Sequence, residues 1–236
     1  MIWESFDDYE ALAERAAMIL LDAVRANPRI VLGLPTGRTP VRMYEHVVQH
    51  CRREQHCFTD VTTFNLDEYV GIPRSHPGSY FTFMRRHLFD HIDIDPSRAN
   101  IPDGTVPDLT AECARYEQAI AGAGGLGMTF LGLGRNGHIG FNEPGTSFDA
   151  RTRVVELTES TRIANAAWFK DGEVPRQAIT IGIGTILDST GIVLLVAGHA
   201  KQKALERLRS GVADASFPAS ALWRHDGVRV LTSVNG

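Results

Sequence analysis

The sequence has few cysteines, no long apolar run and no excess of positive charge. Only three cysteines occur in 236 residues, at Cys51, Cys57 and Cys113, and such an odd, sparse set is typical of a reducing compartment. The longest apolar run, residues 192–198, is far too short to cross a bilayer. The segment MIWESFDDYE at the start is acidic and lacks the charged-then-apolar order of a signal peptide. These absences predict a cytoplasmic protein without a membrane partner.

Charge and composition exclude further classes of protein. The formal net charge is −4, and basic and acidic residues are interspersed, without the basic stripe that indicates nucleic-acid binding. With 43% hydrophobic residues the composition is that of an ordinary globular protein. A chain of this length buries enough surface to fold without a disulfide or a structural metal. We therefore expect a partner that is a small molecule rather than a nucleic acid.

Short β-rich runs alternate with helical patterns along the chain, and this rhythm is typical of parallel βαβ units. No repeat, low-complexity tract or linker interrupts it. We expect a single α/β domain over residues 1–236, with a Rossmann-like, mostly parallel sheet and helices on both faces. Ligands of such a fold bind at the carboxyl ends of the strands. The expected strands are Ile30–Leu34, Val61–Asn65, Met128–Leu133, Val154–Leu157, Ile192–Gly198 and Val228–Ser233.

Side chains that can accept hydrogen bonds from free helix N–H groups mark the expected helix starts. These expected N-caps are Ser5, Thr39, Ser79 and Thr110. A further helix is expected over His199–Ser210, with a basic second half and a stop at Gly211.

The segment LGLPTGRTP, residues 32–40, joins an expected strand to an expected helix. Glycine lets the backbone approach an anion closely, and the free N–H groups and dipole of a helix start favour negative charge. Thr36, Gly37, Arg38 and Thr39 are therefore candidate ligands of a phosphate, although the GK[ST] ending of a Walker loop is missing. The alternative is a tight turn that needs glycine only for its geometry.

Two adjacent carboxylates, Asp67 and Glu68, follow the expected strand Val61–Asn65. One of the two can serve as a base while the other faces solvent or a helix end. A polar strand end without chemistry is the alternative interpretation.

The segment GLGRNGHIGFNEP, residues 132–144, carries His138 and Glu143 on a glycine-rich loop after an apolar strand. Histidine is the side chain that moves protons near neutral pH. A lone loop histidine is usually structural, but this one has a carboxylate nearby and lies at a strand end. The three segments together predict acid–base chemistry on a small phosphorylated substrate.

Six segments resemble the glucosamine-6-phosphate deaminase family, within the glucosamine/galactosamine-6-phosphate isomerase superfamily. They are spread from about residue 30 to residue 225, so the resemblance covers nearly the whole chain. The combination of NGHIGFNEP with DEYVG is the most specific part. The 6-phosphogluconolactonases are similar in fold, but their loop resembles GHxASLFP and lacks FNEP. The matching segments are LGLPTGRTP, FNLDEYVGI, SYFTFMRRHLFDHIDI, GLGRNGHIGFNEPGT, RTRVVELTESTRIAN and PASALWRH.

The resemblance implies conversion of glucosamine 6-phosphate to fructose 6-phosphate and ammonia, through an aldose–ketose isomerisation without a cofactor. It implies that Asp67 takes the C2 proton and returns it at C1. It also implies that His138 assists opening of the pyranose ring, with Glu143 completing its relay. The loop Thr36–Thr39 and Lys201 match family positions that hold the phosphate.

Two positions depart from the family pattern. Many members have an aspartate, in the form DGH, where this chain has Asn136, whose carbonyl can still accept the imidazole N–H. The family usually has N-[SA]-R-F-F where this chain has Ala167 in place of the arginine. A phosphate dianion needs charge-assisted partners, so our hypothesis is that Arg38 supplies the missing cation. The alternatives are help from Lys170 or weaker phosphate binding.

Other functions predict features that the sequence lacks. The alternative substrate is galactosamine 6-phosphate. The deaminases of that sugar have sequences similar to CLATGATP and LDEWVDL where this chain has GLPTGRTP and LDEYVGI. A sugar-phosphate-binding regulator predicts a helix-turn-helix segment, for which the fold leaves no room, and loss of the acid–base residues. No metal is expected, because the HC-x4-HC pattern of residues 50–57 fits no common zinc spacing, and His87 and His91 lack a third ligand. The assembly stays open between a monomer and a homo-oligomer.

Overall fold

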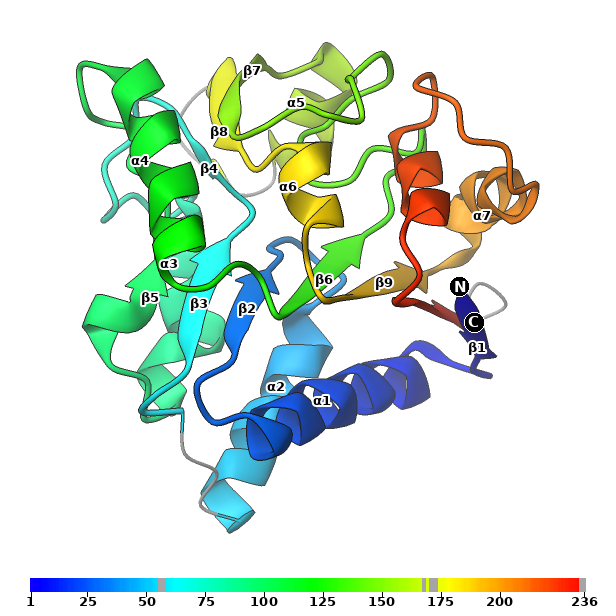
Figure 1. Cartoon of the computed structure of the whole chain (residues 1–236), viewed down its shortest axis with the longest axis horizontal. Coiled ribbons are helices and arrows are strands. Elements are labelled where there is room, and N and C mark those ends of the chain that lie inside the picture. The colour runs from blue at the N-terminus through cyan, green and yellow to red at the C-terminus, as the bar shows by residue number, and fades with distance from the viewer. Residues whose placement is uncertain (55–57, 167–168, 170–173, 234–236) are drawn as a thin grey trace.

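The structure is a computed structural model that describes residues 1–54, 58–166, 169 and 174–233. Its centre is a seven-stranded sheet in which every pairing is parallel, with the order β1-β10-β9-β6-β2-β3-β5 (Figure 1). This confirms the α/β fold with a mostly parallel sheet. Its strands are β1 (Ile2–Ser5), β2 (Val31–Leu34), β3 (Thr62–Asn65), β5 (Ala99–Asn100), β6 (Met128–Gly132), β9 (Gly191–Ala197) and β10 (Val228–Ser233).

Helices cover both faces of the sheet because side chains alternate along each strand. In β6, Phe130 belongs to the apolar cluster beneath the sheet and Leu131 to the cluster above it. The lower face packs on α1 (Tyr9–Ala26), α2 (Val41–Glu54) and α3 (Tyr80–His87). The upper face packs on α4 (Leu109–Gly122), α6 (Ile183–Leu187) and α7 (Gln202–Arg209) (Figure 1).

A second, smaller sheet lies at the carboxyl edge of the main one. It is antiparallel, in the order β4-β8-β7, and consists of β4 (Asp67–Tyr69), β7 (Arg153–Glu156) and β8 (Gln177–Thr180). The short helix α5 (Glu159–Asn165) follows β7. The expected strand Val154–Leu157 therefore exists one residue earlier, but it is not part of the parallel sheet. The sequence of a strand does not predict which sheet it joins, because its partner strands are determined by tertiary packing.

Two expected helix starts are wrong. Ser5 lies in β1, which pairs with β10, and the first helix is capped instead by Asp8, whose carboxylate accepts from the N–H of Ala11 at 2.8 Å. In α4 the cap is Asp108 rather than Thr110. Aspartate and threonine are both good caps, and the sequence alone does not decide between neighbours. Ser79 caps α3 as expected.

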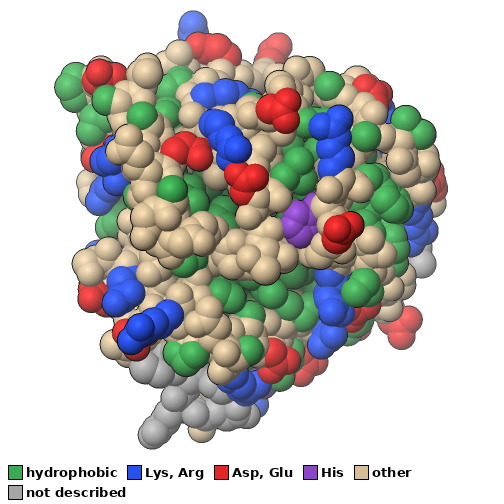
Figure 2. Space-filling view, viewed as in Figure 1, with side chains coloured by type: hydrophobic (Ala, Val, Ile, Leu, Met, Phe, Trp, Pro, Cys, Tyr) green, Lys and Arg blue, Asp and Glu red, His purple; other side chains and the backbone are tan. Residues whose placement is uncertain are grey.

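Acidic and basic side chains are intermixed over the face shown in Figure 2. Among the described residues, none of the helices has both the length and the apolarity that a membrane crossing needs.

Candidate active site

Every sequence-predicted site residue follows one of four neighbouring strands, β9, β6, β2 and β3. Lys201 comes after β9, the loop with Asn136 and His138 after β6, the loop Thr36–Thr39 after β2, and Asp67 after β3. Carboxyl ends of parallel strands meet at one edge of a sheet, so the fold gathers these side chains from distant parts of the chain. The carboxyl end of the sheet is therefore the candidate active site.

Asp67 lies at the bottom of this site. As the first residue of β4 it is paired with Thr180 of β8, and its side chain is only 6% exposed. Its carboxylate accepts no hydrogen bond from the described residues. Burial, together with the neighbouring Glu68 charge, raises the pKa of Asp67 to about 8. A carboxylate with a pKa this high holds a proton far more strongly than an ordinary aspartate, which suits a base that must capture a proton from carbon.

Glu68 points the other way along the same strand, into the start of α3. Its carboxylate accepts from the backbone N–H groups of Tyr69 (2.9 Å), Tyr80 (3.0 Å) and Phe81 (2.9 Å). Burial raises the pKa of Glu68, and these three N–H groups oppose the rise. The sequence predicted that the second carboxylate faces either solvent or a helix end. In the structure Glu68 faces a helix end, the start of α3.

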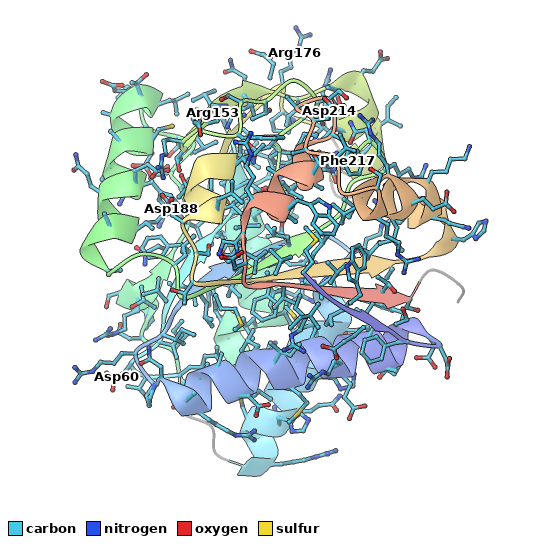
Figure 3. The ribbon with its side chains drawn as sticks, turned by 45° about the vertical axis from the view of Figure 1, so that its right-hand side comes forward. Asp60, Arg153, Arg176, Asp188, Asp214 and Phe217 are labelled. Carbon is cyan, nitrogen blue, oxygen red and sulfur yellow. The ribbon has the colours of Figure 1, made fainter. Side chains whose placement is uncertain are left out.

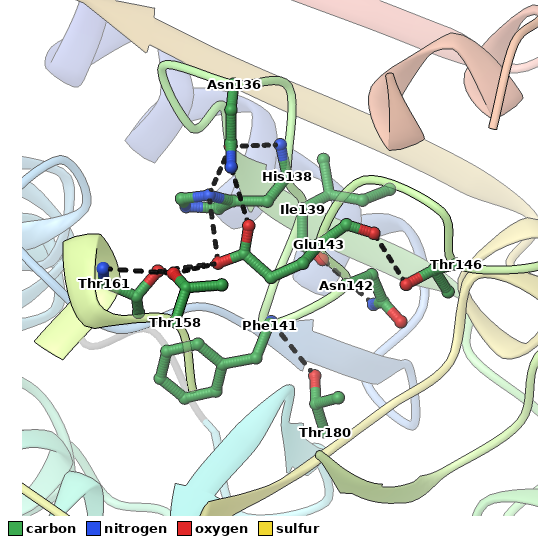
Figure 4. A network of polar contacts seen from close by, with 10 residues as sticks. All are labelled: Asn136, His138, Ile139, Phe141, Asn142, Glu143, Thr146, Thr158, Thr161 and Thr180. Atoms are coloured by element: carbon green, nitrogen blue, oxygen red, sulfur yellow. Dashed lines mark hydrogen bonds and ion pairs between the residues drawn. The ribbon is translucent and has the colours of Figure 1, made fainter. Parts of the chain in front are cut away.

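His138, Asn136 and Glu143 form one polar network (Figure 4). The Nδ1 atom of His138 lies 2.8 Å from Oδ1 of Asn136, and Nδ2 of Asn136 donates to Oε2 of Glu143 at 2.6 Å. The other oxygen of Glu143 accepts from the hydroxyls of Thr161 at 2.6 Å and Thr158 at 3.4 Å. The sequence predicted the first three residues of this network but missed the two threonines, which lie at the start of α5.

The network determines which nitrogen of His138 carries the proton. An ionised carboxylate only accepts hydrogen bonds, so Asn136 must turn its NH₂ group toward Glu143 and its carbonyl toward His138. Nδ1 of His138 is then the donor, and Nε2 is left with a free lone pair. Burial and the charge of Lys201 lower the pKa of His138, against the opposing effect of Glu143. The neutral imidazole is therefore favoured, with Nε2 as a proton acceptor.

Two glycines fix the loop around His138. A Cβ built on Gly134 would lie 2.4 Å from atoms of the His138 ring. Gly137 has a φ of 89°, and a Cβ there would lie 2.2 Å from the ring of Phe217. Figure 3 labels Phe217, which precedes the short helix Pro218–Arg224. The backbone N–H of Ala219 also donates to the Gly137 carbonyl at 2.8 Å. Glycine at position 134 lets the imidazole lie against the loop backbone, which restricts its orientation, and glycine at position 137 lets the Phe217 ring pack against the same loop.

The loop after β2 offers free backbone donors. The N–H groups of Thr36, Gly37, Arg38 and Thr39 have no acceptor among the described residues, and α2 begins just beyond them. The loop is fixed from behind, because Tyr44 donates its hydroxyl to the Pro35 carbonyl at 2.6 Å. Consecutive free N–H groups before a helix start form a concave anion site.

Cations lie near these donors. Lys201 is half-buried, forms no ion pair with a described residue, and has a pKa lowered by burial and by the charge of Arg135. Arg135 was missed by sequence reasoning, although it lies next to Asn136 in GRNGH. It is exposed and, like Arg38, makes no side-chain ion pair within the described ranges. A half-buried ammonium group beside a guanidinium, without a carboxylate, is an arrangement that favours an anion.

Several sequence expectations lie outside the described residues. These are Ala167, Lys170 and the second half of the HC-x4-HC pattern, His56 and Cys57. Within the described ranges no group of three or more His, Cys, Asp or Glu side chains is placed to hold a metal ion.

Comparison with known proteins identifies the family. The model of the glucosamine-6-phosphate isomerases/6-phosphogluconolactonase family matches residues 7–231. The chain belongs to this family. Within it, the chain is 48% identical over 227 residues to a glucosamine-6-phosphate deaminase of Halalkalibacterium halodurans, covering 96% of this chain and 91% of that protein. It is also 48% identical over 224 residues to glucosamine-6-phosphate deaminase 1 of Bacillus subtilis, covering 94% and 93%.

Two solved structures are similar to this chain. A monomeric glucosamine-6-phosphate deaminase superposes with a TM-score of 0.96 at 47% identity, over 98% of this chain and 96% of that one. A 6-phosphogluconolactonase of Thermotoga maritima superposes with a TM-score of 0.77 at 19% identity, over 98% and 97%. The second likeness shows the shared fold alone.

Proposed function

We propose that this protein is a glucosamine-6-phosphate deaminase that converts glucosamine 6-phosphate and water to fructose 6-phosphate and ammonia. The observation that carries the proposal is the pairing of a buried aspartate of raised pKa with a neutral, oriented histidine beside an anion site. The high identity to deaminases over nearly the full length supports the same conclusion. The proposal treats residues 1–236 as one sugar-phosphate isomerase domain that acts in the cytoplasm, as a monomer or a homo-oligomer.

In the first proposed step His138 opens the pyranose ring. Its free Nε2 takes the proton of the C1 hydroxyl and delivers it to the ring oxygen, so that the C1–O5 bond breaks and an open-chain aldehyde forms. Glu143, held by Thr158 and Thr161, stabilises the imidazolium through Asn136, in the manner of a base oriented by a third group. The carboxylate also acts on the imidazole directly, because Oε1 of Glu143 lies 3.9 Å from Nδ1 of His138.

In the second step Asp67 moves a proton between adjacent carbons. Its carboxylate takes the C2 proton of the open-chain sugar and returns it at C1, while a second proton passes from the amine nitrogen to O1, so that the aldose becomes a ketose-level imine at C2. Water adds to this imine and ammonia leaves, which gives fructose 6-phosphate. One residue suffices for both transfers, because C1 and C2 are neighbours and the proton stays on the same face.

The phosphate end of the substrate lies at the other side of the site. The four free N–H groups of the loop after β2 and the ammonium of Lys201 form its proposed binding site, with Arg38 as the hypothesised replacement for the family arginine. Arg135 adds a second guanidinium close enough to lower the pKa of Lys201. Charge-assisted bonds of this kind contribute about 1.5–3 kcal/mol each.

Lys201→Ala should raise KM for the phosphorylated sugar by about 10- to 100-fold, in keeping with the loss of one charge-assisted bond. Arg38→Ala should raise KM as well if its guanidinium reaches the phosphate. Steady-state kinetics of both variants, with the exposed Lys203→Ala as the matched control, measures this. An unchanged KM in Arg38→Ala together with a sharp rise in Lys201→Ala rejects the Arg38 hypothesis and leaves Arg135 as the cation to test next.

The direct test of the function is ammonia release from purified protein given glucosamine 6-phosphate or galactosamine 6-phosphate. We expect release from the glucosamine epimer. Preferential release from the galactosamine epimer favours the alternative substrate, and release from neither sugar, with a folded protein, overturns the proposal.

A further inference from the structure

Glu68 is buried beside the proposed base, yet no step of the proposed reaction uses it. Its side chain is 4% exposed, and it accepts three backbone N–H groups, two of them from the first turn of α3. An ionised carboxylate at a helix start gains both from these bonds and from the helix dipole. The negative charge of Glu68 is thus held in place only one residue from Asp67.

The other titratable groups that the Asp67 charge affects are tyrosines. Tyr44 on α2, Tyr69 on β4, Tyr80 on α3 and Tyr116 on α4 all have a pKa raised by burial, and the Asp67 charge adds to each rise. Arg74 faces Glu68, whose pKa it lowers. Glu68 is accordingly the carboxylate whose charge opposes ionisation of Asp67.

The same contacts reach the phosphate loop. Tyr80, whose N–H donates to Glu68, has its hydroxyl hydrogen-bonded to the hydroxyls of Thr36 and Tyr69. Glu68 therefore connects the strand that carries Asp67, the start of α3 and the anion-binding loop. Moving its carboxylate would disturb the base and the loop together.

We propose that Glu68 is a positioning residue for Asp67, which it fixes at the β4–α3 corner through its hydrogen bonds to the start of α3. This rests on the proposed function, in which Asp67 is the isomerisation base. A stronger base abstracts a carbon-bound proton faster once it is ionised, because proton transfer follows the difference in proton affinity. Glu68 strengthens Asp67 without touching the substrate.

The test is the pH profile of kcat/KM for Glu68→Gln, which keeps the shape and removes the charge. Asp67 must be ionised to act, so the rate rises with pH through the pKa of Asp67 in the free enzyme. We expect the acid limb of the profile to move to lower pH by at least about one unit and the plateau to fall by about tenfold or more. Glu112→Gln is the matched control, because Glu112 is also buried and also accepts a backbone N–H, but lies on α4.

A folded Glu68→Gln enzyme whose acid limb stays with wild type overturns the proposal, and so does an equal shift in Glu112→Gln. Should Glu68→Gln not fold, Glu68→Asp carries the test, because it keeps the charge but shortens its reach. That variant should lose kcat with its acid limb near wild type, and an unchanged kcat counts against positioning. Wild-type protein that releases no ammonia from either sugar refutes the proposed function instead, so the two failures are distinguishable.

Discussion

Asp67→Asn should lower kcat by at least about 100-fold while making the folded protein more stable. The loss of rate follows from removal of the proton acceptor, and general-base contributions begin at about this size. The gain in stability follows from the pKa of about 8 in the folded protein, compared with 3.8 in the unfolded chain. The folded state keeps a proton that the unfolded state releases, so its stability falls as pH rises from about 4 to about 8.

Asparagine removes this cost because it has no proton to lose. At pH 7 the folded wild-type protein has lost stability over roughly three pH units above the unfolded-state pKa of Asp67. The free energy of unfolding should therefore rise by up to about 4 kcal/mol in Asp67→Asn. At pH 4 the two proteins should be close to equal in stability. Chemical denaturation at both pH values measures the gain, and exchange of the C2 hydrogen for deuterium measures the chemistry. Near-normal exchange in the variant would refute Asp67 as the base, and a stability difference that does not change with pH would refute its raised pKa.

Gly134→Ala should reduce kcat/KM by about 100-fold, because the added methyl would lie 2.4 Å from the His138 ring. The ring must move by roughly an ångström, and misplacing a catalytic group by that distance costs about this factor. Gly132→Ala is the matched control two residues earlier, since a Cβ there meets no atom within 4 Å. The control should be close to wild type in activity and in melting temperature.

If His138 acts in ring opening, Gly134→Ala should also discriminate between substrates. An open-chain analogue of the sugar needs no ring opening, so its C2 exchange in the variant should stay near the wild-type rate. Equal losses on closed and open substrates would instead indicate that the whole loop has collapsed. An unaffected Gly134→Ala enzyme would show that His138 has room to move without cost.

Much of the site was predictable from the sequence because its residues follow strands that have clear apolar patterns. Asp67 and the loop Thr36–Thr39 come directly after such runs, His138 lies on the loop that follows a third, and the carboxyl ends of parallel strands must meet. The sequence does not predict in which direction a side chain points when its residue lies outside the parallel sheet. The direction of the Glu68 side chain depends on the antiparallel pairing of β4 with β8, residues 177–180. No local sequence pattern predicts this pairing.

The remaining omissions have similar physical causes. Thr158 and Thr161 look like ordinary helix-start residues, and Thr158 is indeed the N-cap of α5, so their bonds to Glu143 depend on where that helix docks. Arg135 looks like a solvated charge in the sequence, and only the adjacency of β6 and β9 brings it near Lys201. Residue propensity and motif spacing describe one segment of the chain at a time. Each of these contacts joins two segments that are distant in the sequence, so neither property predicts it.

The place of β10 in the sheet has a consequence for how the protein is made. Among the described residues, β10 is the last strand, yet it lies between β1 and β9 and is the strand with which β1 pairs. On the ribosome, β1 must therefore wait until β10 has been translated before it finds this partner. A product that stops before residue 228 contains every predicted catalytic residue, but it exposes the apolar edge of β9 to solvent. An unpaired edge of this kind favours aggregation or proteolysis.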